Sequence, residues 1–356
     1  MSEQTSILVI YTGGTIGMVK DPVTGALMPI NFDQIYQYIP ILESFPFRIE
    51  TISFEPIIDS SDMNPDFWIR LASIVEVHYD QYDGFVILHG SDTMAYTASM
   101  LSFMLENLNK AVVLTGSQLP LGMLRTDGRE NFITAVEIAA SKKDELSVVP
   151  EVCIYFENRL YRGNRTTKLH AEDFDAFYSG NYPLLAEAGV HLRFNHQQIR
   201  KPNFKKLHVY HQLSTDLALL KLYPGITKQA VEALFGIQGL RAVILETFGT
   251  GNAPTEPWFL DALRKATDSG VLIYNVTQCK AGSVEAGRYH TSTELVSMGV
   301  ISGEDITTES AIAKLMYLMG RYTDQDRVRS LLTLSLRGEI TPANSRGVNA
   351  NNDSYR

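Results

Sequence analysis

The 356-residue chain has only two cysteines, Cys153 and Cys279, and both stand in apolar sequence. Two cysteines cannot form a disulfide framework, so we expect a reducing compartment, the cytoplasm. No apolar run approaches the roughly 18 residues that a membrane helix needs. Residues 1–14 also lack the basic stretch and the cleavage site of a signal peptide. These absences predict a cytoplasmic protein with no membrane partner.

The chain also lacks an excess of basic residues. Forty Asp and Glu residues against 31 Lys and Arg give a net charge of −9. Non-specific nucleic-acid binding needs a basic face, so we expect no nucleic-acid partner. The remaining composition, with 45% hydrophobic and 20% charged residues, is that of an ordinary globular protein.

Several familiar site motifs are missing. The stretch TGGTIG at 12–17 is not a dinucleotide fingerprint, because Thr15 occupies the position of a required glycine. The sequence contains neither a P-loop nor the G-x-S-x-G motif of Ser-His-Asp hydrolases. Histidines gather at 191, 196, 208 and 211, but their spacing matches no pattern of metal ligands. We therefore expect neither a cofactor nor a metal.

Short apolar runs alternate with helical patterns along the chain. The runs lie at about 7–11, 85–89, 111–115, 152–156, 217–222, 242–246 and 271–276. Near-continuous apolar runs are typical of strands that are covered on both faces, as in parallel sheets. Helical patterns are expected at 93–108, 127–140, 227–235, 256–266, 308–319 and 324–335. This alternation predicts an α/β architecture.

The length predicts two domains. The polar and basic segment from about 190 to 212 interrupts the alternation, and we interpret it as the connection. We accordingly expect an N-terminal domain at 1–190 that carries the site, a linker at 191–212 and a C-terminal domain at 213–356.

Glycines and hydroxyl residues follow the predicted strands. Thr15 follows the first, Ser91 and Asp92 follow the second, and Lys168 closes the segment after the fourth. Ligands of open α/β sheets bind beyond the carboxyl ends of the strands, so these residues should converge. A hydroxyl is a weak nucleophile until its proton is removed. A desolvated lysine could remove it, whereas a neighbouring aspartate opposes that effect, and the sequence leaves both open. His89 fits a satisfied structural histidine better than a base.

Seven motifs in order carry a resemblance. They are YTGGTIGM (11–18), DSSDM (59–63), HGSDTMAYT (89–97), TGSQLP (115–120), RLYRGNRTTK (159–168), FDAF (174–177) and GTGNAP (249–254). Together they resemble the cytoplasmic type I group of bacterial L-asparaginases. The resemblance implies a larger N-terminal domain with a mostly parallel sheet and a smaller, flavodoxin-like C-terminal α/β domain. It also implies hydrolysis of L-asparagine through an acyl-enzyme.

The resemblance assigns roles by position. Thr15 matches the nucleophile, and Ser91, Asp92 and Lys168 match the family's second group of hydroxyl, acid and lysine. A further set, Asp59, Ser60 and Ser61, matches the segment that holds the α-carboxylate and α-amino group of the substrate. Asp92 also matches a contact to that amino group. The matching position of Asn252 can reach a neighbouring subunit, which implies a homodimer or homotetramer.

The sequence departs from the family pattern at two places near the nucleophile. Ser91 stands where most members have threonine, so the hydroxyl loses the methyl that restricts its rotamer. The expected mobile lid, Met18 to Ile30, has no tyrosine, and Ala26 or Leu27 occupies the position of the residue thought to help activate the nucleophile. These departures leave the activating partner of Thr15 open.

The sequence also departs from the family pattern at a second, regulatory asparagine site that some type I members have. Cys279 matches one of its residues, but Glu246 stands where an arginine is expected. A change from positive to negative charge disfavours binding of a carboxylate, so we expect activation by asparagine to be weak or lost. The alternative for Cys279 is a small buried side chain.

Three other functions remain as alternatives. A glutaminase-asparaginase would share the chemistry and differ in pocket size. A catalytically weak asparagine sensor would explain the missing tyrosine. An amidotransferase subunit would carry an additional domain before the TGGT strand, where this sequence has about six residues.

Overall fold

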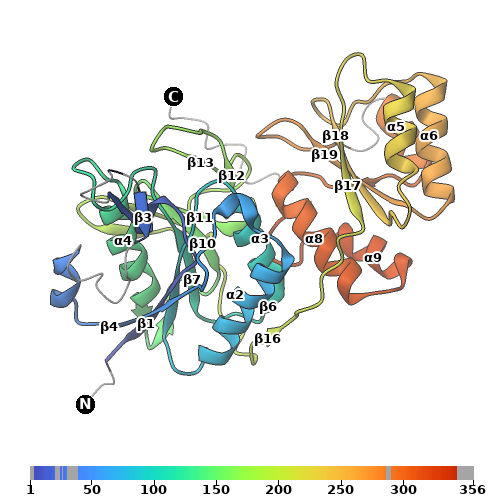
Figure 1. Cartoon of the computed structure of the whole chain (residues 1–356). Helices are drawn as coiled ribbons and strands as arrows, with labels where there is room; N and C mark the ends of the chain where they lie inside the picture. The colour runs from blue at the N-terminus through green and yellow to red at the C-terminus, as the bar shows by residue number, and fades with distance from the viewer. Residues whose placement is uncertain (1–3, 21–24, 26, 30–38, 286–289, 343–356) are drawn as a thin grey trace. The chain divides into compact units, whose positions relative to one another are not determined.

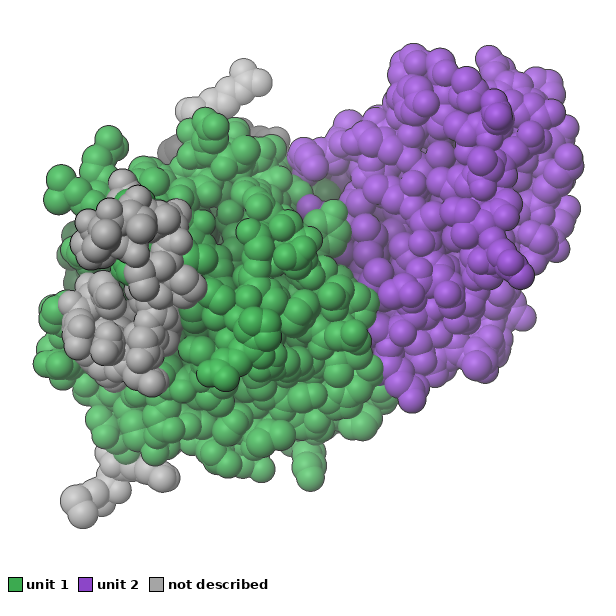
Figure 2. All heavy atoms as spheres, in the orientation of Figure 1, with its two compact units in different colours: residues 1–211 green, residues 212–356 purple. Residues whose placement is uncertain are grey.

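The computed structural model describes residues 4–20, 25, 27–29, 39–285 and 290–342 (Figure 1). The chain forms two compact units, Met1–His211 and Gln212–Arg356, which Figure 2 shows in different colours. Each unit has its own sheet and its own hydrophobic core. The prediction of two α/β domains is confirmed.

The first unit is built on an eight-stranded mixed sheet. Its order is β15 (Leu192–Phe194), β14 (Ala186–Ala188), β11 (Arg159–Arg162), β10 (Val152–Phe156), β7 (Ala111–Thr115), β5 (Gly84–Leu88), β1 (Ser6–Tyr11) and β4 (Arg48–Ser53). The strands from β10 to β4 are parallel, and β11, β14 and β15 continue the sheet antiparallel. The central strands are buried throughout, which explains their continuous apolar sequence.

Helices cover both faces of this sheet (Figure 1). On one face, α4 (Gly128–Ala140) packs Phe132 and Val136 against alternate side chains of the strands, such as Val9 and Val113. On the other lie α3 (Met94–Met104) and α2 (Pro65–His78), which packs on α3. Side chains alternate between the faces of a strand, so each strand contributes to both layers.

Three helices differ from the prediction, among them α7 (His290–Ser297), which was not predicted. The helix expected at 93–108 ends at Met104, because Leu105–Glu106 forms strand β6 and pairs with β16 (His208–Val209) about a hundred residues away. Helix α2 was not predicted, although its signals are present. Asn64 caps it, Pro65 occupies its first position, and Trp68, Leu71, Ala72 and Val75 form its buried face.

The second unit has a four-stranded parallel sheet in the order β17 (Leu217–Lys221), β18 (Ala242–Thr247), β19 (Leu272–Thr277) and β20 (Ile301–Ser302). Helices α5 (Lys228–Phe235) and α6 (Pro257–Asp268) lie together over one face, and α8 (Thr308–Arg321) contacts β18 and β19 (Figure 1). Helix α9 (Gln325–Leu332) packs on α8, and α7 (His290–Ser297) completes the unit.

Short elements fill the connections. Antiparallel pairs join β2 (Met18–Lys20) to β3 (Leu27–Pro29), β8 (Lys142–Lys143) to β9 (Leu146–Ser147), and β12 (Thr167–Lys168) to β13 (Phe177–Tyr178). The short 3-10 helices are η1 (Thr15–Gly17), η3 (Pro40–Ser44), η4 (Ser60–Asp62) and η5 (Gly163–Arg165). The polar segment 191–212 belongs to the first unit up to His211, where it supplies β15 and β16. Among the described residues, no helix is both long and apolar enough to cross a bilayer.

Candidate active site

Glycines bring three loops into contact at the carboxyl ends of β1 and β5. Gly14 has φ 88°, and a Cβ atom on it would lie 2.6 Å from the Cα of Gly90. A Cβ on Gly90 would lie 2.5 Å from the Oγ of Ser60. A Cβ on Gly13, with φ 134°, would lie 2.0 Å from the carbonyl oxygen of Ile58. Side chains at these positions would push the three loops apart.

Hydrogen bonds fix the same three loops to one another. The backbone N–H of Ile58 donates to the Thr12 carbonyl at 2.8 Å. The hydroxyl of Thr12 donates to the Leu88 carbonyl at 3.0 Å, and that of Thr93 donates to the Ser60 carbonyl at 2.7 Å. Segments about 45 and 30 residues apart in sequence therefore form one rigid rim.

Thr15 begins η1 directly after the two glycines and is half-buried. Below it, the Tyr11 hydroxyl donates to the Gly17 carbonyl at 3.2 Å and supports the turn. Burial raises the pKa of Tyr11 to about 12, so this phenol stays neutral at physiological pH. The predicted lid position Ala26 lies outside the described residues, and Leu27 is described only as the first residue of β3.

Lys168 joins Ser91 and Asp92 across more than seventy residues of sequence. Its Nζ donates to the Ser91 Oγ at 2.9 Å and to the Asp92 Oδ1 at 2.6 Å. The lysine side chain is only 16% exposed, whereas that of Asp92 is 67% exposed. The hydroxyl and the ammonium are thus sheltered together, while the carboxylate faces solvent and is accessible to a cationic group of a ligand.

The segment of Asp59, Ser60 and Ser61 forms a compact turn beside this group. The Asp59 carboxylate accepts from the backbone N–H and the hydroxyl of Ser61, each at 2.8 Å, and these bonds lower the pKa of Asp59. Ser60 is buried against Gly90, whereas Asp59 and Ser61 are exposed. The turn therefore presents polar groups to solvent at the edge of the rim.

His89 is a structural histidine, as expected. It is 1% exposed, its Nδ1 lies 2.7 Å from the Gly90 carbonyl oxygen, and its Nε2 lies 2.9 Å from the Thr97 Oγ1. Burial lowers its pKa to about 4, so the ring is neutral at physiological pH. With both nitrogens engaged, it has no position free to act as a base.

Sequence reasoning missed two residues that hold the neighbouring 116–119 loop. Asp127 accepts from the backbone N–H groups of Gln118 and Leu119 at 3.0–3.1 Å. The Asn131 amide donates to the Gly116 carbonyl at 3.0 Å and accepts from the Glu157 N–H at 3.1 Å. Their position at the start of α4 was the available signal, since Asp and Asn there commonly satisfy loop N–H groups.

The two possible regulatory residues lie in the second unit. Glu246 is the second-to-last residue of β18 and is buried. Its carboxylate accepts from the Thr308 hydroxyl at 2.6 Å and lies 3.4 Å from the Lys221 Nζ. Cys279 follows β19 and is exposed, so the alternative that it is a small buried side chain is wrong. The apolar sequence before it belongs to the buried strand and not to the turn that follows.

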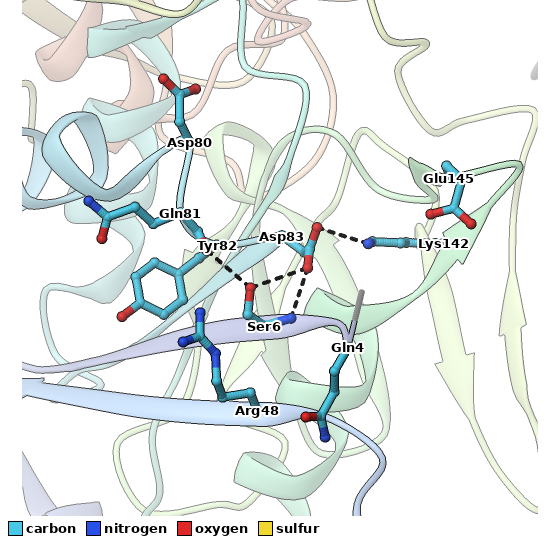
Figure 3. A pocket seen from close by; sticks show the side chains of 9 residues that line it. All are labelled: Gln4, Ser6, Arg48, Asp80, Gln81, Tyr82, Asp83, Lys142 and Glu145. Carbon is cyan, nitrogen blue, oxygen red and sulfur yellow. Dashed lines mark hydrogen bonds and ion pairs between the residues drawn. The ribbon is translucent and has the colours of Figure 1, made fainter. Parts of the chain in front are cut away.

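A polar hollow of about 540 Å³ lies at the opposite, amino ends of the strands (Figure 3). Asp83 occupies its centre and accepts from the Ser6 N–H at 2.8 Å and from the Lys142 Nζ at 2.8 Å. These bonds tie the start of β1 and strand β8 to the loop before β5. In the described parts of the chain, no three His, Cys, Asp or Glu side chains are placed to hold a metal ion.

Comparison with known proteins covers both units. Residues 6–200 match the family model "Asparaginase, N-terminal", and residues 216–332 match "Glutaminase/Asparaginase C-terminal domain". The chain is 44% identical over 351 residues to L-asparaginase 1 of Escherichia coli K12, which covers 96% of this chain and 99% of that protein. It is 42% identical over 359 residues to the 60 kDa lysophospholipase of Homo sapiens, covering 94% of this chain and 61% of that protein. The crystal structure of L-asparaginase I from Vibrio cholerae superposes with a TM-score of 0.87 at 40% identity, covering 96% of this chain and all of that one.

Proposed function

Because the chain belongs to the asparaginase family, we propose that it hydrolyses L-asparagine to L-aspartate and ammonia. The observation that carries this proposal is the contact of Lys168 with Ser91 and Asp92, beside the glycine-packed loop that ends in Thr15. The 44% identity to L-asparaginase 1 of Escherichia coli over nearly the whole chain supports the substrate.

Thr15 is the nucleophile in this proposal. Its Oγ attacks the side-chain amide carbon of asparagine, and the hydroxyl proton passes to the departing nitrogen, which leaves as ammonia. The result is an ester between Thr15 and the aspartyl group. Water then adds to the ester carbon and breaks the bond to Oγ, which releases aspartate and returns the proton to Thr15.

Lys168 and Ser91 supply the proton pathway. The Nζ donates to the Ser91 hydroxyl at 2.9 Å, so a proton can move between the two groups and the reacting atoms. Ser91 and neighbouring backbone N–H groups are the candidate donors for the oxyanion that develops on the amide oxygen. No metal or cofactor takes part in these steps.

Polar groups of the rim bind the α-ammonium and the α-carboxylate of the substrate. The Asp92 carboxylate pairs with the α-ammonium, and Ser60, Ser61 and the adjacent backbone donate to the α-carboxylate. Asp59 holds the turn through its two bonds to Ser61. We further propose that the active protein is a cytoplasmic homodimer or homotetramer.

The test is ammonia release from L-asparagine and L-glutamine, each over a range of concentrations. Thr15→Ala should lower turnover by about 10⁴-fold or more, as loss of a nucleophile does. Lys168→Met should lower it by about 10²–10⁴-fold. Comparable turnover of glutamine would instead favour a glutaminase-asparaginase of broader specificity. Binding of asparagine without any ammonia release would indicate a sensor and would refute the proposal.

A further inference from the structure

A buried chain of hydrogen bonds ends at the centre of the candidate active site. The Trp68 Nε1–H of α2 donates to the Thr97 Oγ1 at 2.9 Å. Thr97, in α3, lies 2.9 Å from the His89 Nε2, and the His89 Nδ1 lies 2.7 Å from the Gly90 carbonyl oxygen. All three side chains are at most 6% exposed, so water does not compete for these bonds.

Each hydrogen bond in this series has a defined donor and acceptor. Indole N–H can only donate and a carbonyl oxygen can only accept, so the two ends set the direction. Nδ1 must carry the proton of the imidazole, and Nε2 must accept from the Thr97 hydroxyl. Burial keeps the ring neutral, and with one proton on the ring these hydrogen bonds fix a single tautomer, with the proton on Nδ1.

The carbonyl at the end of these hydrogen bonds belongs to Gly90, which packs against the two other loops of the rim. Gly90 contacts Gly14 on the nucleophile loop and Ser60 on the substrate-binding turn, and neither contact leaves room for a Cβ. The next residues are Ser91 and Asp92, which contact Lys168. Rotation of the peptide after Gly90 would shift the Ser91 hydroxyl relative to both Thr15 and Lys168.

We propose that His89 is a positioning residue of the asparaginase reaction: its neutral ring, oriented by Trp68 and Thr97, fixes the Gly90 carbonyl and thereby the placement of Ser91 and Asp92. The inference rests on the proposed function and extends it to three side chains that do not contact the substrate. A misplacement of about 1 Å can cost on the order of 10²-fold in rate, so a single hydrogen bond at this peptide matters for turnover.

Two substitutions at His89 separate positioning from packing. His89→Asn keeps a nitrogen donor on the atom bonded to Cβ, where Nδ1 is, and can still reach the Gly90 carbonyl, but it leaves a larger void. His89→Gln fills the volume better and can reach Thr97 but loses the donor to Gly90. Positioning predicts that His89→Gln lowers kcat by about 10–100-fold and that His89→Asn retains more activity, although it is the less stable variant. Activity that follows stability, with the glutamine variant equal or better, would overturn the proposal.

Thr97 provides a second test with a matched rescue. Thr97→Val keeps the shape but removes the donor to Nε2, so kcat should fall several-fold while Thr97→Ser restores it. Histidine ¹⁵N NMR of the wild-type chain supplies a readout that needs no variant to be active. The resonance that is absent from the spectrum of His89→Asn belongs to His89. In the wild-type spectrum it should show a protonated Nδ1 and an unprotonated Nε2 at pH 7. The opposite tautomer overturns the proposal.

Turnover by the wild-type protein distinguishes failure of the proposed function from failure of the positioning role of His89. An inactive wild-type chain refutes the proposed function. An active wild-type chain whose two His89 variants have equal kcat refutes only the positioning role.

Discussion

Among single residues, Gly14 combines an unusual backbone angle with a contact that leaves no room for a side chain. Its φ of 88° is one that residues with a side chain rarely adopt, and a Cβ on it would meet the backbone of Gly90. Gly225, in the second unit, has nearly the same φ of 90° but nothing within 4 Å of the position of a Cβ. Both glycines therefore need a positive φ, but only Gly14 also packs against another backbone segment.

We expect Gly14→Ala to lower kcat/KM by about 10²-fold or more, because the nucleophile loop must move away from Gly90. Gly225→Ala should cost about 1–2 kcal/mol of stability and leave kcat/KM unchanged. Ammonia release and thermal unfolding of both variants provide the measurement. Equal activity of the two variants would mean that the contact between the loops is not needed.

Motif order identified Ser91, Asp92 and Lys168 as residues of interest, but spacing alone could not place them in contact. The 75 residues between Asp92 and Lys168 form three strands of the large sheet, β7, β10 and β11, before Lys168 returns to the rim. The structural role of His89 was expected from its place at the end of an apolar strand. Its partners Thr97 and Trp68 were not, because both are unremarkable members of helical faces in the sequence.

At the scale of elements, the central strands could be predicted because burial on both faces leaves a continuous apolar run. Helix 93–108 could not be bounded correctly, since Leu105 fits the helical face and leaves it only to pair with β16. That pairing depends on residues at 208–209, which no local pattern around Leu105 reveals. Tertiary pairing here outweighs local propensity.

A buried ion pair joins two segments of the second unit. Lys314 of α8 and Glu339 are both fully buried, with 2.8 Å between Nζ and Oε1. Lys314 also donates to the carbonyls of Leu332 and Leu334, and Glu339 accepts from the N–H groups of Leu336 and Arg337. The pair thus fastens the segment after α9 to α8.

We expect this pair to make stability fall in acid. Burial alone would raise the pKa of Glu339, but Lys314 and the two backbone N–H groups outweigh it and lower the pKa. The folded chain then binds fewer protons than the unfolded chain just below the unfolded pKa of about 4.3. The stabilisation is complete above that value and is lost as pH falls through the folded pKa.

Urea unfolding from pH 7 to pH 3 checks this expectation. Glu339→Gln should cost about 3–5 kcal/mol at pH 7 and should flatten the acid dependence, because it leaves Lys314 unpaired. Glu232→Gln, which breaks the exposed pair with Lys228, is the control and should change stability by less than about 1 kcal/mol. An unchanged pH dependence in Glu339→Gln would contradict the assignment.

For the whole molecule, the negative charge of Glu246 affects the expected activation by asparagine. Its buried carboxylate already accepts from Thr308 and pairs with Lys221, and it would repel the carboxylate of an incoming amino acid. We expect rate against asparagine concentration to be hyperbolic, with a Hill coefficient of about 1. Glu246→Gln removes the charge and serves as the control. A clearly sigmoidal wild-type curve would show that activation by asparagine persists.

The oligomeric state is a separate expectation for the whole molecule. Asn252 matches a position that can reach a neighbouring subunit in the family, so we expect a dimer or a tetramer of the 39.8 kDa chain. Light scattering at micromolar concentration measures the mass directly. A mass near that of one chain would refute the expectation.

The two thiols differ sharply in accessibility. Cys153 is fully buried in β10, and burial raises its pKa well above the ordinary value, whereas Cys279 is exposed. Maleimide reagents react with accessible thiolates, so the unmodified sequence should accept one fluorophore, at Cys279. The second unit thus carries a natural attachment point for spectroscopic labels, and fluorescence from that dye would follow its surroundings during turnover without any engineered cysteine.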